Sequence, residues 1–102
     1  MDNSAQQAIE NTHLHYVFII AFARTRDYAE AKDAADQAAH TLTELARLLP
    51  STSPLFPDMR QLRTIILAAR RNLARQQQPQ NLDKGLDLIT TIEEHLNPPE
   101  NT

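Results

Sequence analysis

The sequence has no cysteine, no tryptophan and only one glycine in 102 residues. The absence of cysteine excludes disulfide bonds, thiolate catalysis and cysteine-ligated zinc, and it fits a reducing, cytoplasmic environment. Sheet proteins need glycine in their turns and β-branched residues in their strands, and this chain has neither in quantity. The composition therefore predicts an all-α protein.

Long apolar runs are missing as well. The longest one, residues 16–23, has eight residues, whereas a helix needs about 20 to cross a bilayer. The first twenty residues contain Asp2 and Glu10 and lack a basic region, so we do not expect a cleaved signal peptide. By its length the chain forms one domain, residues 1–102. We expect it to be soluble, with no part of it in a membrane.

Four segments have the pattern of a helix. The last three show apolar residues at alternating spacings of three and four, which is typical of an amphipathic helix, and the middle of the first is apolar on every side. Polar or proline-rich residues separate these segments. The predicted helices cover about residues 4–25, 28–49, 58–77 and 81–96, and a polar tail at 97–102 is expected to fray. The expected architecture is a helical bundle made of two antiparallel hairpins.

The boundary between the first two helices contains neither glycine nor proline. Asp27 is followed three residues later by Glu30, which is the spacing of a capping box, so Asp27 is a candidate N-cap. The alternative is one continuous helix of about 46 residues, which is unusually long for a small domain. A break at Asp27 is the preferred interpretation.

Prolines mark the other two boundaries. Residues 50–57 contain three prolines, which end a helix, and Pro57 fits the first turn of the next one. Pro79 closes the third helix, and Asn81 is a candidate cap for the fourth.

The second helix carries an unbroken stripe that is alanine in its first half and leucine in its second. Small residues let two helix axes approach closely, so bulky neighbours must supply the apolar area. The first helix is apolar on every side over residues 16–23 and is the expected partner; such a helix is typical of a bundle centre or of an oligomer. We expect self-association, with a C₂ dimer as the default. The residues expected in the core or the oligomer contact are Tyr16, Phe18, Ile19, Phe22, Tyr28, Ala31, Ala35 and Ala38.

The stretch FARTRDYAEA, with its large-to-small step from Tyr28 to Ala31, resembles the junction of a tetratricopeptide-like helical hairpin. In that family an aromatic and a small residue pack here against the preceding helix, which implies the same for Tyr28 and Ala31. The resemblance covers about residues 15–42, with a second copy of the pattern at 62–96. Ile19 stands where the family has a small residue, no proline closes the unit, and the period is 54 rather than about 34. The resemblance implies helical hairpins that bind a partner.

Few residues are candidates for chemistry. Glu10 and His13 have the spacing of two metal ligands on one helical face, but carboxylate-bridged metal sites need two such motifs and two further glutamates. We therefore expect His13 in solvent or at the core edge. His40 and His95 are expected at the surface or as cations at helix ends. The sequence contains no nucleophile elbow, no glycine-rich phosphate loop and no thiol. We expect no enzyme activity, no metal and no cofactor.

Charge is distributed unevenly along the chain, although the net charge is only −3. Residues 59–78 contain five arginines and no acid, whereas residues 27–49 and 80–102 hold five acids each. On a helical wheel the arginines lie opposite the apolar stripe. They are Arg60, Arg63, Arg70, Arg71 and Arg75.

Three roles are open for this arginine face. In the first, the arginines pair with the acidic second and fourth helices of the same chain or of another copy. In the second they bind an acidic protein, and in the third they bind the phosphates of a nucleic acid. The negative net charge and the lack of a helix-turn-helix pattern disfavour nucleic acid. The sequence thus predicts a non-enzymatic interaction module of the adaptor, chaperone-like or toxin-neutralising type, which binds another protein through a helical groove. A nucleic-acid-associated regulator is the alternative.

Overall fold

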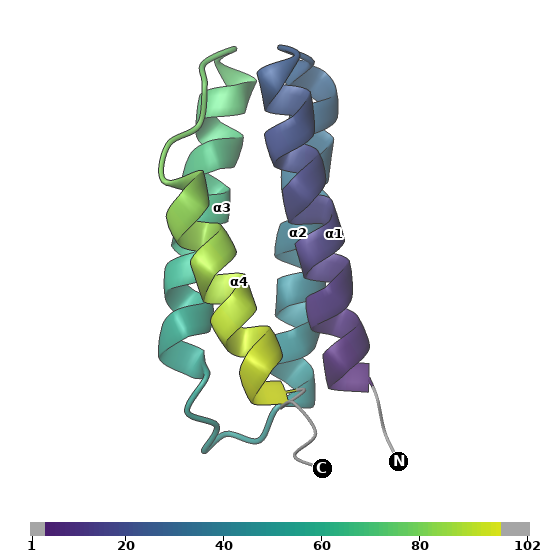
Figure 1. The fold of residues 1–102 in the computed structure, drawn as a ribbon, viewed down its shortest axis with the longest axis vertical. Helices are drawn as coiled ribbons and strands as arrows, with labels where there is room; N and C mark the ends of the chain where they lie inside the picture. The colour runs from purple at the N-terminus through teal and green to yellow at the C-terminus, as the bar shows by residue number, and fades with distance from the viewer. Residues whose placement is uncertain (1–3, 97–102) are drawn as a thin grey trace.

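The computed structural model describes residues 4–96, which form four helices and no strand (Figure 1). The predicted all-α class is confirmed. None of these helices combines the length and the hydropathy that a membrane span requires. The predicted tail at 97–102 lies outside the described residues. The helices are α1 (Ser4–Arg24), α2 (Tyr28–Leu48), α3 (Phe56–Ala74) and α4 (Leu82–Leu96).

Successive helices run in opposite directions along the long axis of the bundle (Figure 1). The α1–α2 pair has the most extensive packing; α2 also packs on α3, and α4 packs on both α3 and α1. With 15 residues α4 is the shortest of the four. It covers only the lower part of the bundle in Figure 1, and the connection from α3 to α4 runs along the upper part.

The turn between α1 and α2 is a Schellman motif that contains no glycine. The N–H of Asp27 donates to the carbonyl of Phe22 at 2.9 Å, and the N–H of Arg26 donates to that of Ala23 at 3.1 Å. Arg26 has a φ of 61°, in the left-handed region that residues with a Cβ enter at a cost. The predicted break is therefore present, and the alternative of one continuous helix is wrong.

Capping at Asp27 differs from the prediction. Asp27 occupies the N-cap position of α2, but its side chain makes no capping hydrogen bond. Its carboxylate instead accepts a hydrogen bond from Oγ1 of Thr25 at 2.9 Å. The start of α2 is fixed by the backbone, since the N–H of Ala31 donates to the carbonyl of Asp27 at 2.9 Å.

A second Schellman motif ends α3 three residues before the predicted boundary. The N–H groups of Gln76 and Gln77 donate to the carbonyls of Leu73 and Asn72 at 3.0 and 2.8 Å. Gln76 adopts the left-handed conformation, with a φ of 58°. Because this turn reverses the chain, the helix stops at Ala74, well before the proline that was expected to close it.

The other helix starts lie close to their predicted places. α3 begins at Phe56, two residues earlier than expected, and Pro57 lies in its first turn, where its missing N–H has no helical partner to lose. α4 begins at Leu82, directly after Asn81, whose φ of 63° is one that asparagine tolerates. The carbonyl of Asn81 accepts the N–H of Gly85 at 3.2 Å and so takes part in the first turn.

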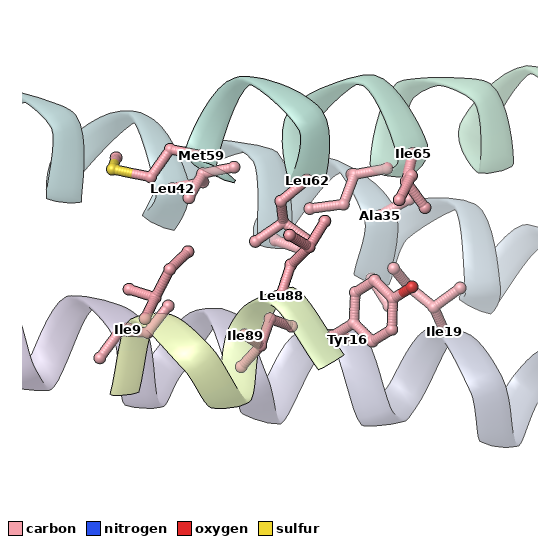
Figure 2. Close-up of a cluster of buried hydrophobic side chains, with 14 of the residues drawn as sticks. Ile9, Tyr16, Ile19, Ala35, Leu42, Met59, Leu62, Ile65, Leu88 and Ile89 are labelled. Carbon is pink, nitrogen blue, oxygen red and sulfur yellow. The ribbon is translucent and has the colours of Figure 1, made fainter. Parts of the chain in front are cut away.

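All four helices contribute to one hydrophobic core (Figure 2). The alanines of α2 lie at its centre, and Ala31, Ala35 and Ala38 are fully buried. The bulk comes from α1, where Tyr16 and Ile19 are fully buried too. Small side chains on one helix and large ones on the other allow close approach of the two axes without leaving a void.

Tyr16 reaches from α1 to the start of α4. Its hydroxyl donates to the carbonyl of Leu82 at 2.7 Å. A Cβ on Gly85 would lie only 2.0 Å from the Tyr16 oxygen, so the single glycine of the chain stands where α4 crosses this side chain. Burial, and in second place the negative charge of Asp83, raise the pKa of the Tyr16 phenol.

One polar side chain, Thr12, is buried completely between α1 and α2. Its Oγ1 donates to the carbonyl of Ala8 at 2.8 Å and shares a hydrogen bond with Oγ1 of Thr41 at 2.7 Å. Throughout residues 4–96, no buried side-chain nitrogen or oxygen lacks a hydrogen-bond partner. The contact between the two threonines therefore fixes the register of the helix pair without an energetic penalty for burial.

The connection between α3 and α4 is tied to the turn between α1 and α2. Nε2 of Gln78 donates to the carbonyl of Ala23 at 2.8 Å and to the hydroxyl of Tyr28 at 3.3 Å. A segment without regular structure thus closes the upper end of the bundle through specific hydrogen bonds.

Candidate functional site

Two of the five predicted arginines reach from α3 to α2. Arg70 binds the carboxylate of Asp36, whose other oxygen lies 3.7 Å from Nζ of Lys32. Arg63 donates to Oγ1 of Thr43 at 3.0 Å. Asp36 and Thr43 are seven residues apart on α2, and Arg70 and Arg63 are seven apart on α3. The two contacts therefore repeat after two turns of an antiparallel helix pair.

One turn beyond the contact between Arg63 and Thr43, the side chains of α2 and α3 leave a hollow between the two helices. Three residues after Thr43, α2 carries Ala46, and three residues before Arg63, α3 carries Arg60. Alanine offers no acceptor to a guanidinium and is too small to fill the space. The result is a shallow hollow of about 140 Å³, which we call the α2–α3 hollow. It is lined by Leu42, Thr43, Ala46, Phe56, Met59, Arg60 and Arg63.

The floor of the α2–α3 hollow is apolar, and its rim is basic. Leu42 and Met59 are buried at the bottom, and Phe56 is half-buried beside them. Arg60 at the rim is exposed. Its carbonyl accepts a hydrogen bond from Oγ1 of Thr64, but its guanidinium has no hydrogen-bond or ion-pair partner in the part of the chain that the structure describes. A guanidinium with open donors next to an apolar floor suits an apolar side chain that is accompanied by a carboxylate.

The structure divides the predicted arginine face into two groups. Arg63 and Arg70 lie on the flank of α3 and contact α2. Arg60 and Arg71 on α3, and Arg75 directly after its last residue, are exposed and, within residues 4–96, form no hydrogen bond or ion pair with another helix. The Arg70 pair is about two-fifths exposed on both sides, so we assign it at most about 1 kcal/mol of stability.

The residues predicted for the core or an oligomer contact differ in burial. Phe22 and Tyr28 are half-buried and pack against the core, whereas Phe18 is 40% exposed. The Phe18 ring lies 6.3 Å from that of His15 and 6.0 Å from that of Phe22. The fully buried members of the set are Tyr16, Ile19, Ala31, Ala35 and Ala38.

His13 of the Glu10 and His13 pair contacts a glutamate of another helix. Nδ1 of His13 lies 3.0 Å from Oε2 of Glu93 on α4, and Glu10 is exposed. In residues 4–96 no three acidic, histidine or cysteine side chains are grouped as metal ligands. His40 and His95 are exposed. His13 therefore joins α1 to α4.

Sequence reasoning singled out two residues of the hollow, Arg60 and Arg63, but not Ala46 or Phe56. Ala46 resembles the buried alanines earlier in α2, and only its place opposite an arginine distinguishes it. Phe56 carried a usable signal, because a large aromatic directly before Pro57 starts the next helix with an apolar side chain near its first turn.

No protein-family model, curated protein or solved structure matches this chain. The tetratricopeptide-like resemblance at Tyr28 and Ala31 stays a prediction.

Proposed function

We propose that this protein is a non-enzymatic interaction module that binds an acidic segment of another protein at the α2–α3 hollow. The observation that carries the proposal is the pairing of an apolar floor with an arginine rim in one concave place. Such a place favours amphipathic segments that present an apolar anchor and neighbouring carboxylates.

Each part of the hollow has a role in this proposal. The anchor, a leucine or phenylalanine of the partner, occupies the space above Ala46 and contacts Phe56 and Met59. Arg60 binds an adjacent carboxylate of the partner through a bidentate pair of hydrogen bonds. Arg63 is held at the rim by Thr43 and has further N–H groups for a second carboxylate.

The size of the hollow bears on the kind of protein. About 140 Å³ receives one side chain, which suits the reversible partner exchange of an adaptor, a chaperone-like or a toxin-neutralising protein. The cysteine-free composition favours a cytoplasmic location.

A labelled synthetic helical peptide tests the proposal. It carries one leucine anchor flanked by glutamates, and a control peptide has lysines in place of the glutamates. We expect anisotropy to report binding of the acidic peptide only. Ala46→Leu fills the hollow and Arg60→Glu reverses the rim charge, so each should weaken binding at least about tenfold.

Arg71→Glu is the matched control, because Arg71 is exposed on the same face of α3, about 16 Å from Arg60 at 1.5 Å per residue. This variant should bind the acidic peptide as the wild type does. Equal loss in both arginine variants, or no binding by the wild type, contradicts the proposal. Tight binding of duplex DNA that falls steeply with salt and depends on Arg71 and Arg75 indicates the nucleic-acid regulator instead.

A further inference from the structure

The outer face of α1 carries an apolar patch that the rest of the bundle leaves uncovered. Leu14, Val17 and Phe18 are 50%, 43% and 40% exposed. Among residues 4–96, the one other large apolar side chain of comparable exposure is Leu48 on α2. Single exposed apolar side chains are ordinary, but three neighbours on one helix face form a continuous surface.

Charged residues stand at both ends of this patch. Glu10, Leu14, Val17, Ala21 and Arg24 follow one another at spacings of four, three, four and three, and all five are exposed. This is the seam pattern of paired helices, and we call it the α1 stripe. Glu10 and Arg24 each lie seven residues from Val17, in opposite directions, and they carry opposite charges.

We propose that the α1 stripe binds the α1 stripe of a second copy, antiparallel, about a two-fold axis that passes near Val17. In this arrangement Glu10 of each copy faces Arg24 of the other, and two ion pairs enclose an apolar centre. A parallel arrangement would place Glu10 against Glu10 and Arg24 against Arg24. The charge pattern therefore selects both the partner, another copy of this chain, and its direction.

The stripe is separate from the α2–α3 hollow. Its residues all belong to α1, whereas the residues that line the hollow all belong to α2 and α3. Self-association through α1 leaves the hollow open, so the dimer would present two hollows. Either proposal can fail while the other holds.

Sedimentation velocity over the micromolar range tests the dimer. We expect the wild type to pass from monomer to dimer as concentration rises. Val17→Glu places a charge at the centre of the contact in both copies and should leave only monomer, with an unchanged circular dichroism spectrum because Val17 lies on the surface. Glu94→Arg, an exposed charge reversal on α4, is the matched control and should dimerise normally.

A charge swap tests the direction of the helices. Glu10→Arg or Arg24→Glu alone places like charges opposite each other and should raise the dissociation constant of the dimer about tenfold. The double variant restores both ion pairs and should return the constant to about the wild-type value. A wild type that stays monomeric, a dimer that survives Val17→Glu, or a double variant no tighter than the singles would overturn the proposal.

Discussion

Replacing Gly85 by alanine should destabilise the bundle, although alanine is the better helix former. The new Cβ would lie 2.0 Å from the oxygen of Tyr16 and 2.6 Å from Cζ. Tyr16 is fully buried and hydrogen-bonded to the carbonyl of Leu82, so its ring has no free space into which to move. The clash must therefore displace either the ring or the start of α4.

Three contributions determine how much Gly85→Ala changes the free energy of unfolding. Overpacking a core costs about 1–3 kcal/mol. Displacing the tyrosine leaves the carbonyl of Leu82 without its donor, at about 1–3 kcal/mol. The higher helix propensity of alanine compared with glycine stabilises the helix by about 1 kcal/mol. We expect a net loss near 3 kcal/mol, which for a domain of this size lowers the melting temperature by about 10–20 °C.

A double-mutant cycle isolates the cause. Tyr16→Leu removes the three atoms nearest to the new Cβ, so in that background Gly85→Ala should be neutral or stabilise by up to about 1 kcal/mol. Alanine and glycine variants of Lys84, exposed in the same helix, measure the propensity difference alone. Gly85→Ala at or above wild-type stability, or an equal cost in both backgrounds, would refute the reasoning.

Three further changes have defined outcomes. Arg26→Gly and Gln76→Gly relieve left-handed backbone and should each stabilise by about 1 kcal/mol in denaturant titrations, whereas Gln77→Gly, outside that conformation, should not. Because burial raises the pKa of Tyr16 above its ordinary 10.0, the stability that its proton confers is complete below pH 10 and falls as the pH rises above it. The melting temperature of the wild type should therefore drop more between about pH 9 and about pH 11 than that of Tyr16→Phe; an equal drop contradicts this. Ala38→Leu should cost about 1–3 kcal/mol in a thermal melt, and an unchanged melt would exclude close packing there.

Residue spacing predicted the helices because burial imposes its period on the sequence. The alanine stripe of α2 could be recognised as buried, since Ala31, Ala35 and Ala38 keep one face through a polar helix. The helix ends were less predictable. Arg26 and Gln76 have left-handed backbone conformations, which glycine or asparagine usually adopts at the end of a helix. Because neither residue is glycine or asparagine, the sequence did not predict the two Schellman motifs.

The candidate site depends on register, which a single sequence does not contain. Five arginines on one helix were evident, but which of them meets α2 follows from the antiparallel alignment that pairs Arg70 with Asp36. The hollow arises because the same alignment places Ala46 near Arg60. The run around Phe18 was likewise apolar on every side, and the positions of α2 and α4 decide which of its faces are covered.

Because α4 is short, we expect it to separate from the bundle before the other helices unfold. Three side-chain hydrogen bonds tie α4 to α1, and they join Tyr16 to Leu82, His13 to Glu93 and Gln6 to Leu96. Releasing α4 breaks these bonds and leaves the larger contacts of α1 with α2 and of α2 with α3 intact. Amide hydrogens of α4 would then exchange with solvent through a partial opening, at a lower free energy than those of the α1–α2 pair.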